Sequence, residues 1–132
     1  MAPVEVEIGF AAAEGDGRGI AYARLRASAV QQLLRVGFRM RAGFAEGEIG
    51  YAALTAVAQA LRKRGLKSVA LGVDDWALVS GLSGGDIPEA AVLPYVRLKC
   101  ALNRFDEVKV TAVQPGDLAQ RARAEVALLP AA

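Results

Sequence analysis

The stretch GYAALTAVAQALRKRGLKSVALGVDDWALVSGLSG, residues 50–84, decides the fold of this chain. Its first part repeats apolar residues at i, i+3, i+4 and i+7, which predicts an amphipathic helix that ends at Gly65. Residues 69–73, VALGV, are apolar without alternation, as expected of a central strand covered on both faces. Asp74 and Asp75 follow, and a second helix begins at Trp76. Ligands bind beyond the carboxyl ends of strands in open α/β sheets, so the two aspartates mark a candidate site.

The composition limits the chemistry that the chain can carry. Its 132 residues fit one domain, residues 1–132, with frayed ends expected at 1–3 and 130–132. The sequence has no His and one Cys, which excludes a Ser-His or Cys-His nucleophile pair, a His-ligated zinc site and an internal disulfide. Cys100 lies between Leu98 and Leu102, so we expect it to be a small buried residue. We find no signal-peptide pattern and no apolar run of membrane-spanning length, and we expect a cytoplasmic protein.

The rest of the chain alternates strands and helices around this stretch. The predicted strands cover residues 4–10, 20–25, 35–41, 69–73 and 108–113. A polar link, residues 28–32, separates the second strand from the third. Further helices are expected from Pro94 and from Asp117, the latter as a helix cap. The resulting order, βββ-α-β-α-α-β-α, implies three meandering strands followed by parallel strands joined by helical crossovers.

Two groups of basic residues are candidates for nucleic-acid binding. Arg35, Arg39 and Arg41 share one face of the third strand, and Arg62, Lys63 and Arg64 end the first helix. Each group also has a structural explanation, because charge protects a sheet edge from aggregation and basic side chains stabilise a helix C-terminus. A net charge of +2 permits a nucleic-acid partner without requiring one. No aromatic residues interleave with the strand arginines to form a stacking platform.

Several strings, taken in order, resemble the ribonuclease H-like superfamily over nearly the whole chain. They are Val6, Glu7 and Ile8 with the Gly-rich residues 15–19, the run 51–65, the segment 73–84, and residues 103–113. The resemblance implies an α/β fold with a five-stranded mixed sheet, order 3-2-1-4-5, flanked by helices. It also implies hydrolysis of the RNA strand of RNA–DNA hybrids by two Mg²⁺ or Mn²⁺ ions. Carboxylates from the first strand, first helix, fourth strand and last helix would hold these ions.

Only part of that carboxylate set has a counterpart in this chain. Ala11 occupies the first-strand position and Gly50 the first-helix position, whereas Asp74 matches the fourth strand. Asp117 fits the last-helix position if the preceding loop is shortened, and Glu125 or Arg123 falls near it in a longer alignment.

Neighbouring carboxylates are candidate substitutes for the missing ligands. Glu46 shares the face of Gly50 about 6 Å further along the helix axis, whereas Glu48 is rotated by about 200° and aims elsewhere. Asp16 and Glu14, in the loop after the first strand, are within possible reach of Asp74, and Asp75 is better placed as a helix cap.

We therefore interpret the chain as a degenerate ribonuclease H-like domain, a pseudoenzyme that binds nucleic acid such as an RNA–DNA hybrid. In this interpretation Asp74 is the remnant of the metal site and no cofactor is needed. A second interpretation is a working Mg²⁺- or Mn²⁺-dependent ribonuclease H with displaced ligands from Asp16, Glu46, Asp74 and Asp117. A third is a non-catalytic structural or protein-interaction domain that forms a homodimer through a strand edge, which the basic third strand disfavours.

Overall fold

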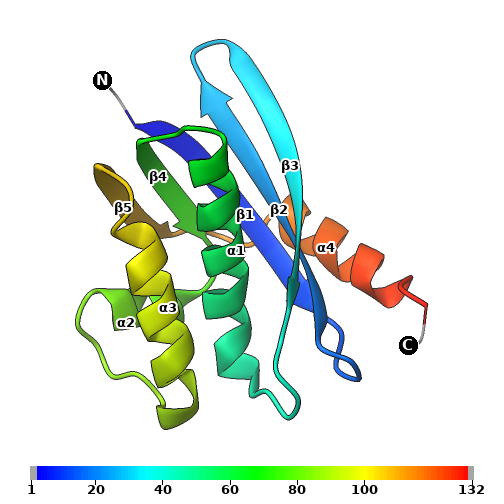
Figure 1. Ribbon diagram of the computed structural model, residues 1–132. Coiled ribbons are helices and arrows are strands. Elements are labelled where there is room, and N and C mark those ends of the chain that lie inside the picture. Colours follow the sequence, from blue (N-terminus) through cyan, green and yellow to red (C-terminus); the bar gives the residue numbers. More distant parts are fainter. Residues whose placement is uncertain (1–2, 131–132) are drawn as a thin grey trace.

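The computed structural model describes residues 3–130, and Figure 1 shows a sheet with helices on both faces. The strands are β1 (Val4–Ala12), β2 (Arg18–Ala27), β3 (Val30–Arg39), β4 (Ser68–Val73) and β5 (Glu107–Ala112). The helices are α1 (Ile49–Lys63), α2 (Trp76–Leu82), α3 (Val92–Leu102) and α4 (Asp117–Ala127), with short 3₁₀ turns η1 (Glu46–Glu48) and η2 (Glu89–Ala91). None of the helices within residues 3–130 is long and apolar enough to cross a membrane. The expectation of frayed ends at residues 1, 2, 131 and 132 lies outside the described residues.

The sheet has the predicted order, β3-β2-β1-β4-β5. β1 pairs antiparallel with β2, and β2 with β3, whereas β4 lies parallel to both β1 and β5. Parallel strands need a crossover connection, and α1 and the α2–α3 segment each precede the next parallel strand in the sequence. The prediction of a five-stranded mixed sheet is confirmed.

Alternating residues divide the core into two parts on opposite faces of the sheet. Val6 and Ile8 of β1 pack with Leu54, Val57 and Leu61 of α1 in the larger part. On the other face, α4 places Leu118 and Ala122 against Ile20 and Tyr22 of β2. Gly9 permits this contact, because a Cβ at this position would overlap the backbone of Leu118 and Ala119. α4 therefore lies directly on β1, and it covers the sheet close to the carboxyl end of that strand.

Several local predictions were wrong at element ends. The residues predicted as a polar link instead include the start of β3 at Val30, after a tight turn in which Ser28 has φ 55°. α3 begins at Val92, so Pro94 falls in its first turn, where the missing N–H has no intrahelical acceptor. Gly116, and not Asp117, is the N-cap residue of α4.

Cys100 is exposed and not buried as predicted. The face of α3 that packs on the core carries Leu98, Ala101 and Leu102. Cys100 is two residues from both Leu98 and Leu102, which is a rotation of about 200° around the helix, so it falls on the outer face.

Candidate functional site

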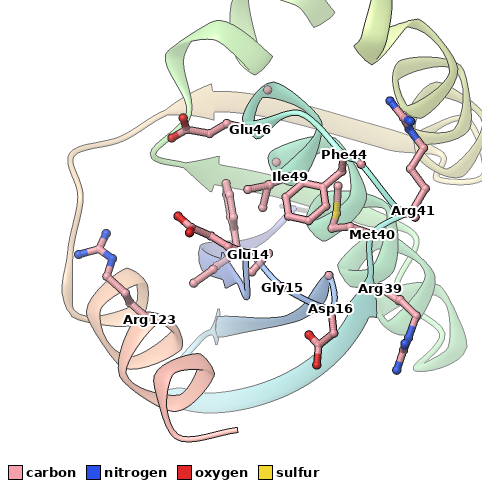
Figure 2. Close-up of a pocket in the computed structure, with 18 of the residues that line it drawn as sticks. Glu14, Gly15, Asp16, Arg39, Met40, Arg41, Phe44, Glu46, Ile49 and Arg123 are labelled. Atoms are coloured by element: carbon pink, nitrogen blue, oxygen red, sulfur yellow. The ribbon is translucent and has the colours of Figure 1, made fainter. Parts of the chain in front are cut away.

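A cleft of about 1080 Å³ lies at the carboxyl ends of β1 and β4, where the position of the two aspartates predicts a site (Figure 2). It is lined by Phe10, Ala11 and Ala12 of β1, residues 14–17, residues 39–44, Glu46, Gly47, Ile49, Gly50, Asp75 and Arg123. The strands, the N-terminal end of α1 and one side of α4 therefore meet at one opening.

Ala11 and Gly50 are both walls of this cleft. Neither residue carries an oxygen atom in its side chain. Gly50 is buried in the first turn of α1, and a Cβ on it would overlap Oδ2 of Asp75 and lie 3.1 Å from Cδ1 of Leu78. The Asp75 carboxylate thus fills the space into which a side chain at position 50 would extend.

Asp75 has two roles, of which sequence reasoning predicted one. Its Oδ1 accepts a hydrogen bond from the Leu78 N–H at 3.0 Å, which confirms the predicted cap of α2. Its Oδ2 faces Gly50 at the cleft wall. Burial, followed by the negative charge of Asp75, raises the pKa of the neighbouring Tyr51 hydroxyl. Asp74 is half-buried and adjacent in sequence, but it is not among the residues that line the cleft.

Of the other predicted carboxylates, Asp16 and Glu46 line the cleft and Asp117 does not. Asp16 lines the cleft, but it accepts hydrogen bonds from the backbone N–H and the Nε of Arg18, which hold its pKa below the usual value. Asp117 lies outside the cleft lining and pairs with Arg24, whose hydrogen bond lowers the pKa of that carboxyl. Glu46 is exposed in η1 and does line the cleft.

Sequence reasoning gave little weight to Glu14 and Arg123. In Figure 2 the carboxylates of Glu14 and Glu46 are directed to the same side of the cleft as the Arg123 guanidinium. Arg39 and Arg41 extend from the opposite side. Arg123 was identifiable from the longer alignment of the last helix. Glu14 lies in the loop after β1, and no hydrophobic periodicity predicts the path of that loop. Among residues 3–130, no three carboxylate or thiol side chains are close enough together to hold a metal ion.

Three of the six predicted nucleic-acid-binding residues have structural partners. Arg35 pairs with Glu125, which also accepts a hydrogen bond from the Tyr22 hydroxyl. Arg62 donates to the Leu66 carbonyl at 3.2 Å and lies 5.7 Å from the Phe105 ring centroid.

The third such residue, Arg41, forms a forked ion pair with Glu48, through Nε–Oε1 at 2.9 Å and a second nitrogen–Oε2 contact at 2.8 Å. The Glu48 side chain is 1% exposed and also accepts the Ala45 N–H at 2.7 Å. Burial alone would raise the pKa of Glu48, but the hydrogen bonds from Arg41 and Ala45 lower it overall. Glu48 is not among the residues that line the cleft.

The remaining three predicted basic residues, Arg39, Lys63 and Arg64, make no ion pair within residues 3–130. Arg39 lines the cleft. Lys63 and Arg64 lie at the opposite end of α1, about 20 Å from Gly50 at 1.5 Å per residue. The two predicted basic groups therefore belong to different ends of the molecule, and only Arg39 combines an unpaired guanidinium with a place on the cleft.

No protein-family model matches the sequence, and no curated protein matches it either. The structure, however, is similar to solved ribonucleases H. RNase H1 from the halophilic archaeon Halobacterium salinarum NRC-1 matches with a TM-score of 0.72 and 23% identity, over 93% of each chain. The N-terminal RNase H domain of rv2228c from Mycobacterium tuberculosis matches with a TM-score of 0.68 and 16% identity, over 96% of this chain and 97% of that one. The chain has the ribonuclease H fold.

A third match, LC11-RNase H1, was solved in complex with an RNA/DNA hybrid, and it has a TM-score of 0.60 and 10% identity over 92% of this chain. Of the four positions that the resemblance assigns to carboxylates, Ala11 and Gly50 line the cleft, whereas Asp74 and Asp117 do not. The residues present do not fit two metal ions, because two walls of the cleft are Ala11 and Gly50 and the Asp75 carboxylate is already a helix cap.

Proposed function

We propose that this chain is a ribonuclease H-fold domain that binds nucleic acid through its cleft and does not hydrolyse it efficiently. The observation that carries the proposal is the pair Ala11 and Gly50, which line the cleft and stand at two positions that the ribonuclease H resemblance assigns to metal-binding carboxylates. In this proposal Asp74 is the remnant of a metal site, and binding needs no Mg²⁺ or Mn²⁺.

The charges of the cleft indicate where a phosphate backbone would lie. Without a bound metal ion, the carboxylates of Glu14, Glu46 and Asp75 disfavour an anion close to them in the cleft. Arg39 and Arg123 stand on opposite sides of the opening and have no ion pair within the described chain. We therefore place the nucleic-acid backbone along the rim, between these two guanidinium groups. The similarity to an RNase H1 solved with an RNA/DNA hybrid supports a hybrid as the first ligand to test.

Binding in EDTA tests the proposal directly. A labelled RNA–DNA hybrid is titrated by fluorescence anisotropy over a series of salt concentrations, and the logarithm of the affinity is expected to fall linearly with the logarithm of salt. Arg39→Ala and Arg123→Ala should each reduce the slope by about 1. Arg97→Ala, on exposed α3, is the control and should leave the slope unchanged. The absence of detectable binding at low salt would refute the proposed function.

The other predicted basic group can be tested in the same titration. Lys63 and Arg64 lie at the far end of α1 from the cleft. A Lys63→Ala/Arg64→Ala variant should bind the hybrid as the unmodified chain does. A reduced slope in this variant, with no change for Arg39→Ala, would place the nucleic acid at that end of the molecule instead.

A second candidate function is a Mg²⁺- or Mn²⁺-dependent ribonuclease H with displaced ligands. The observation in its favour is that Glu14, Glu46 and Asp75 line one cleft. Glu46→Gln separates the two candidates, because removing a negative charge should strengthen metal-free binding of the hybrid but weaken metal-dependent cleavage. Mn²⁺-dependent cleavage of the hybrid that Glu46→Gln and Asp74→Asn both abolish would establish the nuclease and overturn the proposed loss of catalysis.

A further inference from the structure

Trp76, the chain's one tryptophan, is 76% exposed. It is the first residue of α2, and Leu78, two residues later, is 1% exposed on the buried face of that helix. Two residues correspond to a rotation of about 200°, so Trp76 projects from the opposite face of α2. It belongs to neither part of the hydrophobic core. Its large apolar surface thus makes no contribution to the packing of the described chain.

Trp76 is held close to the cleft by its neighbour in the sequence. Asp75 lines the cleft and caps α2 through the hydrogen bond to the Leu78 N–H. This bond fixes the start of α2, so the backbone of Trp76 is held one residue from a wall of the cleft. An exposed aromatic ring on a fixed backbone next to a binding cleft is a ready contact surface for a flat ligand group.

We propose that Trp76 is a stacking platform for an unpaired base of a nucleic-acid strand bound at the cleft. This inference rests on the proposed function, and it adds the class of nucleic acid that the site prefers. Stacking on an aromatic ring needs the face of a base, which is covered in a duplex but free in a single strand or an overhang. Arg39 and Arg123 would hold the backbone by charge, and Trp76 would hold a base. The preferred ligand is therefore a single-stranded RNA or DNA segment, or a hybrid that carries a single-stranded overhang.

The single tryptophan makes the test direct, because emission excited at wavelengths that tyrosine does not absorb reports on Trp76 alone. Three probes are used in EDTA: a single-stranded RNA of about 12 nucleotides, a hybrid with an RNA overhang, and a blunt hybrid. The first two should quench the emission and protect the indole from acrylamide. The Trp76→Ala variant should bind them about tenfold more weakly, and Trp76→Phe should retain most of the affinity. Binding of the blunt hybrid should change by less than about twofold.

A matched control distinguishes stacking from a general loss of apolar surface. Leu93 is 59% exposed on α3, and Leu93→Ala should bind all three probes as the unmodified chain does. If labelled probes bind by anisotropy, but Trp76→Ala binds them equally well and the emission does not change, the stacking inference is wrong while the proposed function stands. If no probe binds, the proposed function itself fails. Emission that shifts with protein concentration alone would assign Trp76 to a contact between copies of the chain and overturn the inference.

Discussion

Gly50→Ala is the most informative single substitution, because helix propensity and packing predict opposite signs for it. Alanine stabilises a helix relative to glycine by up to about 1 kcal/mol. Against this, the added Cβ overlaps Oδ2 of Asp75 and lies 3.1 Å from Cδ1 of the buried Leu78. If the Asp75 carboxylate rotates away, α2 loses its cap, which costs about 1 kcal/mol. Pressing on Leu78 adds an overpacking term of about 1–3 kcal/mol.

Packing wins in this sum, and we expect Gly50→Ala to be destabilised by about 2 kcal/mol, with a fall in Tm of about 8 °C. Urea unfolding followed by circular dichroism measures the free energy, and an unchanged m-value confirms that only stability has changed. Gly47→Ala is the matched control, because nothing lies within 4 Å of a Cβ at Gly47 and its φ is not in the left-handed region. That variant should be as stable as the unmodified chain or slightly more so.

The double variant Gly50→Ala/Asp75→Ala tests whether the two residues compete for the same space. Asp75→Ala alone should cost about 1 kcal/mol through the lost cap. Once the carboxylate is absent, Gly50→Ala should cost about 1 kcal/mol less than it does in the unmodified chain. If Gly50→Ala is as stable as Gly47→Ala, or if the two substitutions are strictly additive, the Asp75 carboxylate does not pack against α1 in solution and does not close that wall of the cleft.

Three further predictions concern stability. Arg41→Ala should cost about 2 kcal/mol in urea unfolding, because it removes charged hydrogen bonds from the buried Glu48 carboxylate. The pKa of Glu48 is lower in the folded than in the unfolded chain, so its contribution to stability is present above the unfolded pKa and is lost as the pH falls through the folded pKa. This acid-dependent loss of stability should be smaller in Arg41→Ala. Urea midpoints measured from neutral to acidic pH test the difference. Gly9→Ala should cost at least about 3 kcal/mol or prevent folding, because its Cβ meets the backbone of α4. Gly37→Ala is the control and should be neutral, because nothing lies within 4 Å of a Cβ at that position. Thermal unfolding compares the two variants.

The fold was predictable because burial imposes a period on the residues that matter most. The helix that ends at Gly65 has the apolar spacing of a helix, and residues 69–73 are an apolar run that is long enough for a buried strand but too short for a helix. The prediction for Cys100 failed because it was made from apolar neighbours in the sequence and not from the helical period. Leu98 and Leu102 are buried, whereas Cys100, two residues from each, lies about 200° around α3 and is exposed.

Side-chain partnerships between distant elements were not predictable from the sequence. Arg35 and Glu125 are 90 residues apart, and no local pattern relates them. Their pairing depends on α4 lying across β1 and β2, which in turn requires the small residue at Gly9. The same limit applies to Trp76: the sequence placed it correctly at the start of α2, but its exposure follows from how that helix packs on its neighbours.

Gly50 affects the cleft by more than its lack of a side-chain oxygen. α1 has no side chain at Gly50, and the Asp75 carboxylate occupies the space beside it. Asp75 stabilises α2 in this position. A side chain at position 50 would therefore collide with a carboxylate that α2 needs as its cap. A glutamate at position 50 would have to displace a helix cap before it reached the cleft, and an aspartate at position 11 would leave that wall closed. Gly50 and Asp75 are therefore coupled through packing, which supports the proposal that the cleft binds nucleic acid without a metal ion.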